Sequence, residues 1–185
     1  MVTSSRTADA ASGDIALAFA NAHGALAAPA ALVEWLSDRQ LLDETVLASL
    51  GPPELRRLHS EGIRLHGTVL SLLHGLAEER PLDAPACFEI NRVLEAATWH
   101  RRIELDGAGG SIHESLRPST LPGLLAPIAL AVAALAESAP GGRLRTCAAE
   151  ACARWFLDTS KGGRRRWCSM ATCGNRAKAA RWRAT

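Results

Sequence analysis

The chain contains no tyrosine, and only 4% of its residues are aromatic. It also lacks the short motifs that build common catalytic sites, such as a glycine-rich phosphate loop, a nucleophile elbow or an H-E-x-x-H metalloprotease helix. Carboxylates are abundant, but nothing in the sequence places a pair of them at one site. We therefore expect a protein that is not an enzyme.

Long apolar segments are missing as well. The longest nearly continuous one, Leu124–Ser138, is too short to cross a bilayer, which takes about 20 residues. Residues 1–13 are small and polar, so they are expected to be disordered and not to act as a secretory signal. These absences predict a cytoplasmic protein with no membrane partner, and they make Leu124–Ser138 the expected central core helix of a first domain.

Four of the five cysteines lie in two pairs near the end of the sequence, with the spacing C-x4-C-x15-C-x4-C. They are Cys147, Cys152, Cys168 and Cys173. Two thiolates a few residues apart reach one metal ion when the chain between them forms a knuckle, and two knuckles make the closed four-cysteine site of structural zinc. Two disulfides would also pair these residues, but the odd fifth cysteine, Cys87, and the absence of a signal favour one structural Zn²⁺.

The residues around the cysteine pairs predict a β-hairpin and a helix. Arg154–Leu157 and Arg164–Trp167 have the composition of two short strands, joined at a Gly-Gly turn. After Cys173, residues 174–183 are rich in strong helix formers, which puts the last ligand at a helix N-terminus. The order knuckle, β-hairpin, knuckle, helix is that of a treble-clef-like zinc finger.

The segment Arg166–Lys178 resembles the CGNR zinc finger, a family named for the tetrapeptide that stands here as residues 173–176. Upstream residues also fit that family's pattern: Cys147, Cys152, Phe156, Asp158 and Lys161. In bacteria this finger commonly follows an N-terminal ABATE domain, in proteins described as stress-induced transcription regulators. The resemblance implies a bacterial, DNA-binding transcription regulator of that organisation.

The net charge of +2 conceals an uneven distribution. Residues 143–185 carry eleven Lys/Arg against Glu150 and Asp158, a net charge of +9, whereas residues 1–142 carry −7. Zinc with four thiolates would lower the charge of the finger to about +7. This density of arginine is typical of a nucleic-acid-binding domain. The alternative is a solvated tail, or one that docks on an acidic surface, including the acidic half of this chain.

Residues 14–140 predict a mainly α-helical, ABATE-like domain that contains a small β-hairpin, followed by a linker and the finger at 143–185. Helices are expected at 29–39, 43–50, 54–79, 87–97 and 124–138. Strands are expected at 99–105 and 110–114. Residues 15–22 suit either a short helix or a buried extended run. They resemble the ABATE opening Leu-Asp-Phe-x-Asn-Thr, with Ala18 and Ala22 in place of its acidic and hydroxyl residues.

Three histidines, His59, His66 and His74, fall on one face of the longest predicted helix. Residues two turns apart are about 10–12 Å from each other, so they cannot share one metal ion. We expect them to form a partly exposed polar stripe.

The function that these features predict is a zinc-dependent DNA-binding regulator, in which the first domain senses a small-molecule effector or forms a homodimer. Phosphate contacts are expected from Lys161, Arg164, Arg165, Arg166, Arg176, Lys178, Arg181 and Arg183. Base-edge contacts are expected from Asn175 and Arg176, although Asn175 has the alternative role of capping its helix. Two other classes remain open, an RNA-binding module and a protein-interaction adaptor that uses the basic finger.

Overall fold

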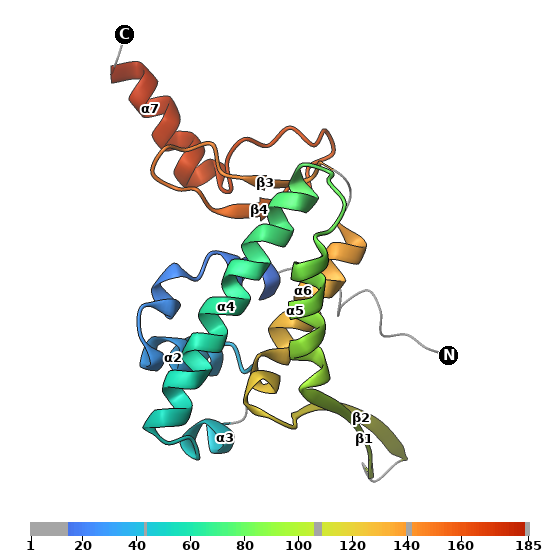
Figure 1. Ribbon diagram of the computed structural model, residues 1–185. Coiled ribbons are helices and arrows are strands. Elements are labelled where there is room, and N and C mark those ends of the chain that lie inside the picture. The colour runs from blue at the N-terminus through green and yellow to red at the C-terminus, as the bar shows by residue number, and fades with distance from the viewer. Residues whose placement is uncertain (1–14, 43, 106–108, 140–141, 184–185) are drawn as a thin grey trace.

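The computed structural model describes residues 15–42, 44–105, 109–139 and 142–183. The predicted disorder of residues 1–13, the predicted helix start at Asp43 and the linker residues 140–141 lie outside this part of the chain. Residues 15–20 are helical, which decides between the two conformations expected there. Figure 1 shows a helical body with a β-ribbon at one end and the finger at the other.

Helices make up most of the first unit, as predicted. They are η1 (His23–Leu26), α2 (Pro29–Asp38), α3 (Glu44–Ala48), α4 (Pro52–Ala77), α5 (Ala84–Glu95), η2 (Leu121–Leu125) and α6 (Ala126–Ser138). Helix α5 begins three residues before the predicted start at Cys87, because Pro85 suits a first helical turn. Phe88 lies on α5 but does not join the core, because it is 72% exposed.

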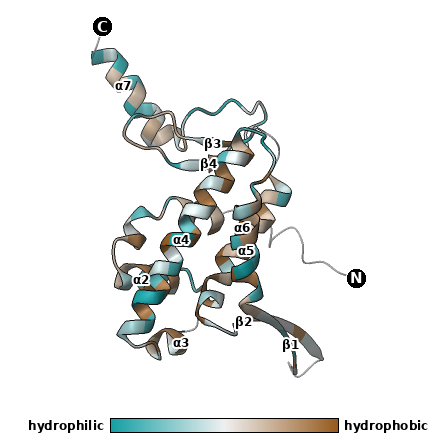
Figure 2. Ribbon diagram, in the orientation of Figure 1, coloured by the Kyte–Doolittle hydropathy of each residue, from teal (hydrophilic) through white to brown (hydrophobic). Residues whose placement is uncertain are grey.

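The core lies where α4 packs against α2, α5 and α6. Helix α4 runs without a break through its three glycines. Packing against α2 explains why one of them, Gly62, has no side chain. A Cβ at this position would lie 2.8 Å from the Leu32 side chain, so the glycine allows α2 to approach closely. Helix α6 is apolar on nearly every side and contributes fully buried residues such as Ile128 and Val132. In Figure 2 it is brown along most of its length.

The burial of α6 shows whether its apolar stretch is a core helix or a membrane-spanning segment. The segment Leu121–Ser138 is apolar and long enough to cross a membrane by composition, but half of it is buried inside the protein. It therefore behaves as the predicted core helix.

The β-ribbon consists of β1 (Ala97–Leu105) and β2 (Gly110–Pro118), paired antiparallel from Ala97 opposite Pro118 to Leu105 opposite Gly110. This confirms the predicted hairpin and lengthens its second strand. The ribbon's root contacts α5, η2 and α6. Its far end extends away from the helices (Figure 1).

The finger contains β3 (Leu144–Thr146), β4 (Trp155–Leu157), a wide turn η3 (Met170–Gly174) and α7 (Asn175–Arg183). The predicted hairpin had one wrong strand. Residues 155–157 pair with 144–146, and residues 164–167 form an irregular loop. The reason is local, because the Arg165 N–H donates to Asp158 Oδ2 and the Arg166 carbonyl accepts from the Ala148 N–H.

Candidate metal centre and basic surface

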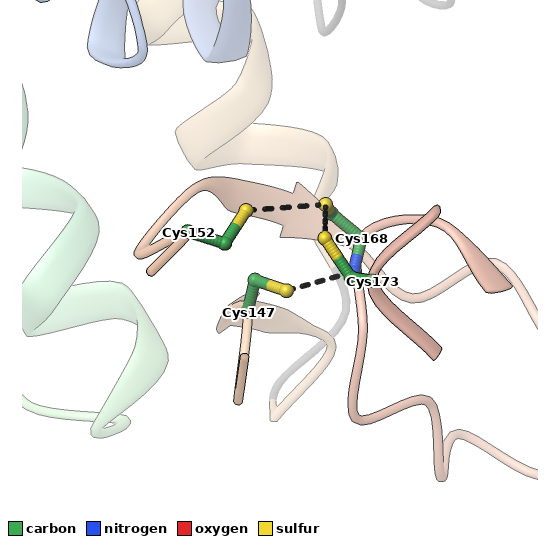
Figure 3. A group of neighbouring side chains, drawn as sticks. All are labelled: Cys147, Cys152, Cys168 and Cys173. Atoms are coloured by element: carbon green, nitrogen blue, oxygen red, sulfur yellow. Dashed lines mark hydrogen bonds between the residues drawn. The ribbon is translucent and has the colours of Figure 1, made fainter. Parts of the chain in front are cut away.

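The four paired cysteines meet at one point of the finger, and all four sulfur atoms lie within 4.8 Å of one another (Figure 3). Cys168 Sγ is 3.7 Å from Cys152 Sγ and 3.8 Å from Cys173 Sγ. A tetrahedron of sulfurs at the usual Zn–S distance of about 2.3 Å has edges of about 3.8 Å, so the cluster has the size of a zinc site. The chain holds one structural zinc ion through these residues.

Backbone hydrogen bonds shape the first knuckle. The Cys147 N–H donates to the Arg154 carbonyl, and the Cys152 N–H donates to the Ala149 carbonyl, so the chain turns tightly between the first two ligands. The Cys168 N–H then donates to Cys147 Sγ at 3.4 Å, which ties the second pair to the first. The pairing of β3 with β4 therefore closes the first knuckle, and the Cys168 hydrogen bond brings the second pair of ligands to it.

The thiols differ in acidity in the absence of metal. Burial opposes ionisation of Cys147, but hydrogen bonds led by the one from the Cys168 N–H lower its pKa to about 7. Burial and the neighbouring thiols raise the pKa of Cys168 to about 12. Cys168 is therefore protonated at neutral pH without metal, and the positive charge of a metal ion is needed to ionise it.

The four residues of the tetrapeptide 173–176 have different structural environments. Cys173 is the last ligand, and a Cβ on Gly174 would overlap Met170 Sδ, so a larger residue would have to displace the Met170 side chain. The Asn175 amide donates to the Ala171 carbonyl, so the side chain has a structural bond, but not the predicted cap, in which its oxygen would accept from a backbone N–H of α7. The Arg176 side chain makes no hydrogen bond or ion pair with the described residues and is exposed.

A cavity of about 430 Å³ lies beside the metal centre, and Arg176 lines it. Arg154 and Asn21 lie on the same cavity, together with the ligands Cys152, Cys168 and Cys173. Arg154 was not among the predicted site residues because nothing in its sequence neighbourhood distinguishes it from an ordinary strand residue. The fold brings two exposed guanidinium groups to one hollow at the junction of the two units.

Asp158 organises the loop that follows β4. Its carboxylate accepts from the Ser160 hydroxyl and N–H and from the Arg165 N–H. The Ser160 hydrogen bond is the main cause that lowers the pKa of Asp158 to about 2, so this buried side chain stays ionised well below neutral pH. The loop in turn carries Lys161 and Arg164 on its exposed side.

The predicted nucleic-acid contacts divide into two groups. The Arg165 guanidinium donates to the Cys168 carbonyl at 2.6 Å and lies over the Phe156 ring, so it contributes to the finger's own structure. The other cationic residues predicted to contact nucleic acid are exposed: Lys161, Arg164, Arg166, Arg176, Lys178, Arg181 and Arg183. No residue of α7 is buried, and the helix projects from the body, with hydrophilic residues repeated along it in Figure 2.

The finger is joined to the first unit through Trp155, which is buried in the core of that unit. The Asn21 side chain bonds both backbone groups of Trp155. Its amide N–H donates to the Trp155 carbonyl at 2.9 Å, and its oxygen accepts from the Trp155 N–H at 2.8 Å. The His74 ring packs edge-on against the indole, with centroids 4.7 Å apart. These residues fix the finger at the C-terminal end of α4.

The three histidines of α4 match the expected partly exposed stripe only in part, because His74 is exposed and His59 is half-buried, whereas His66 is buried. His59 Nε2 lies 2.9 Å from the Leu26 carbonyl, and the buried His66 lies 3.2 Å from the Ala20 carbonyl. Burial is the main cause that lowers the pKa of His66, so its ring is neutral at physiological pH. All three rings bind neighbouring segments to the same face of α4.

Replacing Asn21 with alanine should loosen the junction, because the Trp155 N–H and carbonyl would both lose their partner inside the protein. Unpaired buried groups cost about 1–3 kcal/mol each. Hydrogen–deuterium exchange should show faster uptake at residues 155–157, with unchanged helical circular dichroism. Asn91→Ala, an exposed asparagine on α5, is the matched control. Unchanged protection of β4 in Asn21→Ala would show that the indole alone holds the finger.

The architecture is therefore that of a four-cysteine zinc finger docked on a helical domain. Residues 143–185 match the CGNR zinc finger, and residues 13–139 match ABATE, whose description is "Putative stress-induced transcription regulator". Because the ABATE match covers more than half of the chain, the protein belongs to the ABATE family, with a C-terminal CGNR zinc finger. A search of curated proteins gives no match.

Proposed function

We propose that this protein is a DNA-binding transcription regulator of the bacterial cytoplasm, and that it grips the DNA backbone with the exposed face of the finger. The observation that carries the proposal is helix α7, which is strongly basic and has no buried residue. A helix with no buried residue gains little from packing against its own protein, so its Arg and Lys side chains remain in solvent. A positively charged helix of this kind fits the phosphate-lined grooves of a duplex.

The basic side chains on neighbouring segments support the same partner. Lys161, Arg164 and Arg166 extend the positive surface from α7 to the loop that Asp158 shapes. The cavity that Arg154 and Arg176 line would take a hydrogen-bond acceptor of the DNA next to the metal centre. Because the zinc site is structural, its contribution is to hold these segments in place.

The family description supports the regulatory role, and the charge distribution argues against an adaptor that binds the acidic half of its own chain. Trp155 and Asn21 already hold the finger against the first unit, and this contact consists of a buried indole and hydrogen bonds between neutral groups. The exposed Lys161, Arg164 and Lys178 make no ion pair with the described residues of the first unit and remain available to an external polyanion.

The salt dependence of binding tests this proposal. If about six cations reach phosphates, the logarithm of the affinity for duplex DNA should fall with the logarithm of the salt concentration at a slope of about −5. Fluorescence anisotropy with a labelled duplex measures the slope between about 50 and 200 mM salt. Arg164→Ala should flatten it by about one unit. Arg57→Ala, an exposed arginine on α4, should leave it unchanged.

The other classes predict different results in the same assay. Affinity that is indifferent to salt, or no binding at low salt, would reject the proposal in favour of an adaptor. Structured RNA and unlabelled duplex DNA can also be compared as competitors of the labelled duplex. If the RNA displaces the labelled duplex at the lower concentration, the proposal is rejected in favour of an RNA-binding module.

A further inference from the structure

The β1–β2 ribbon has two unlike faces, because successive residues of a strand point to opposite sides. The pairing register places the apolar residues of both strands on one face: Ala97, Trp99, Ile103, Leu105, Ile112 and Leu116. The other face is polar and includes Thr98, His100 and Arg102. Thr98 Oγ1 and His100 Nε2 are 3.1 Å apart, as expected for neighbours on one side.

Only the root of the apolar face is covered. Ala97 and Leu116 pack against the core, whereas Trp99 is 56% exposed, Ile112 67%, Ile103 71% and Leu105 86%. The face is therefore a continuation of the hydrophobic core that runs out into solvent. The register also places Arg101 and, opposite it, Glu114 on this face, so that one charged pair separates Trp99 from Ile103 and Ile112.

The exposed part is large for a soluble protein. These four side chains present surface on the order of 500 Å², close to the largest apolar patches on soluble monomers, which are often functional. A two-stranded ribbon is only marginally stable in water unless one face is covered. Both arguments indicate that another surface packs on this face.

We propose that the occupant is a second copy of this chain, and that two ribbons pack apolar face on apolar face about a two-fold axis. A two-fold interface is self-complementary, so each copy covers what the other exposes. The two ribbons together bury on the order of 1,000 Å², which reaches the lower end of specific protein interfaces, where association is weak and reversible.

The position of the ribbon suits this dimer. The ribbon and the finger lie at opposite ends of the molecule (Figure 1), so the interface leaves both fingers exposed. A cavity of about 590 Å³ at the ribbon's root extends the apolar surface, because Leu41, Leu42 and Val46 line it beside Leu116. Side chains of the partner's ribbon can therefore find further apolar contacts there.

Sedimentation velocity of the full-length, zinc-loaded chain at about 1–100 µM tests the proposal in the range where such an interface dissociates. The wild type should pass from monomer to dimer across this range. Ile103→Thr with Ile112→Thr keeps the β-propensity of both positions but removes apolar surface, and should raise the dissociation constant at least about 100-fold. Leu105→Lys should act in the same direction, and because this side chain is 86% exposed, the change leaves the monomer's packing intact.

Two matched control variants distinguish association through the ribbon from non-specific hydrophobic association. Phe88→Ser removes a side chain that is 72% exposed but lies on α5, and Arg102→Thr changes the polar face of the ribbon. Both should dimerise as the wild type does. A wild type that stays monomeric at about 100 µM would overturn the proposal, as would ribbon variants that dimerise normally or a Phe88→Ser variant that loses the dimer.

The dimer is independent of the proposed DNA binding, since it is measured without nucleic acid. A monomer that binds DNA with the expected salt slope would reject only the dimer. A protein that dimerises but does not bind DNA would reject only the proposed function.

Discussion

Replacing Cys168 with serine should remove zinc from the protein and unfold the finger while leaving the helical core intact. Few residues of the finger are buried away from the first unit: the small cluster there consists of Phe156 with Cys147 and Cys173. Such a cluster cannot offset the entropy of ordering some forty residues. Metal binding by comparable zinc fingers contributes about 10–16 kcal/mol, so its loss should dominate every other change discussed here.

Elemental analysis should find one zinc per wild-type chain and none in Cys168→Ser. Hydrogen exchange in the variant should rise throughout residues 144–183, and also at the end of α4, where the His74 ring packs on Trp155. Helical circular dichroism should persist. Cys87→Ser is the matched control, because this cysteine lies on α5, outside the cluster, and its loss should leave the zinc content at one. A Cys168→Ser protein that keeps its zinc and its exchange protection would contradict the assignment.

Replacing Arg176 with alanine should have the largest effect on sequence preference. The side chain is exposed at the start of α7, lines the cavity beside the metal, and has no partner among the described residues, so its fork of donors is available to a guanine edge. On a site selected from random DNA, the loss should cost about 1–3 kcal/mol, whereas affinity for unrelated sequences should fall much less.

Lys178→Ala is the matched control for this experiment, since Lys178 is also exposed on α7 and is expected to contact phosphate alone. It should weaken binding to all sequences alike. Equal losses on every sequence in Arg176→Ala would make Arg176 a backbone contact too, and would place sequence recognition elsewhere on the finger.

Local patterns were sufficient for the helices and the metal ligands. The apolar spacing of α4 and α6 repeats within a few residues, and the knuckles bring each cysteine pair together over five residues, so both signals are present in short windows of sequence. The finger's hairpin could not be found in this way. Its true strand, Leu144–Thr146, has only three residues and pairs across an intervening knuckle, whereas the loop at 164–167 has an equally suitable composition.

The sequence by itself determined the ligand set, the helical class of the first unit and the concentration of positive charge in the finger, because each depends on residue type and short-range spacing. Only the tertiary structure decided that Asn21 bonds Trp155 across 134 positions, that His59, His66 and His74 bind neighbouring segments, and that Arg154 joins Arg176 at one cavity. It also decided which face of the β1–β2 ribbon remains uncovered. These features depend on contacts between distant segments, which form only when the burial of apolar surface brings the helices together.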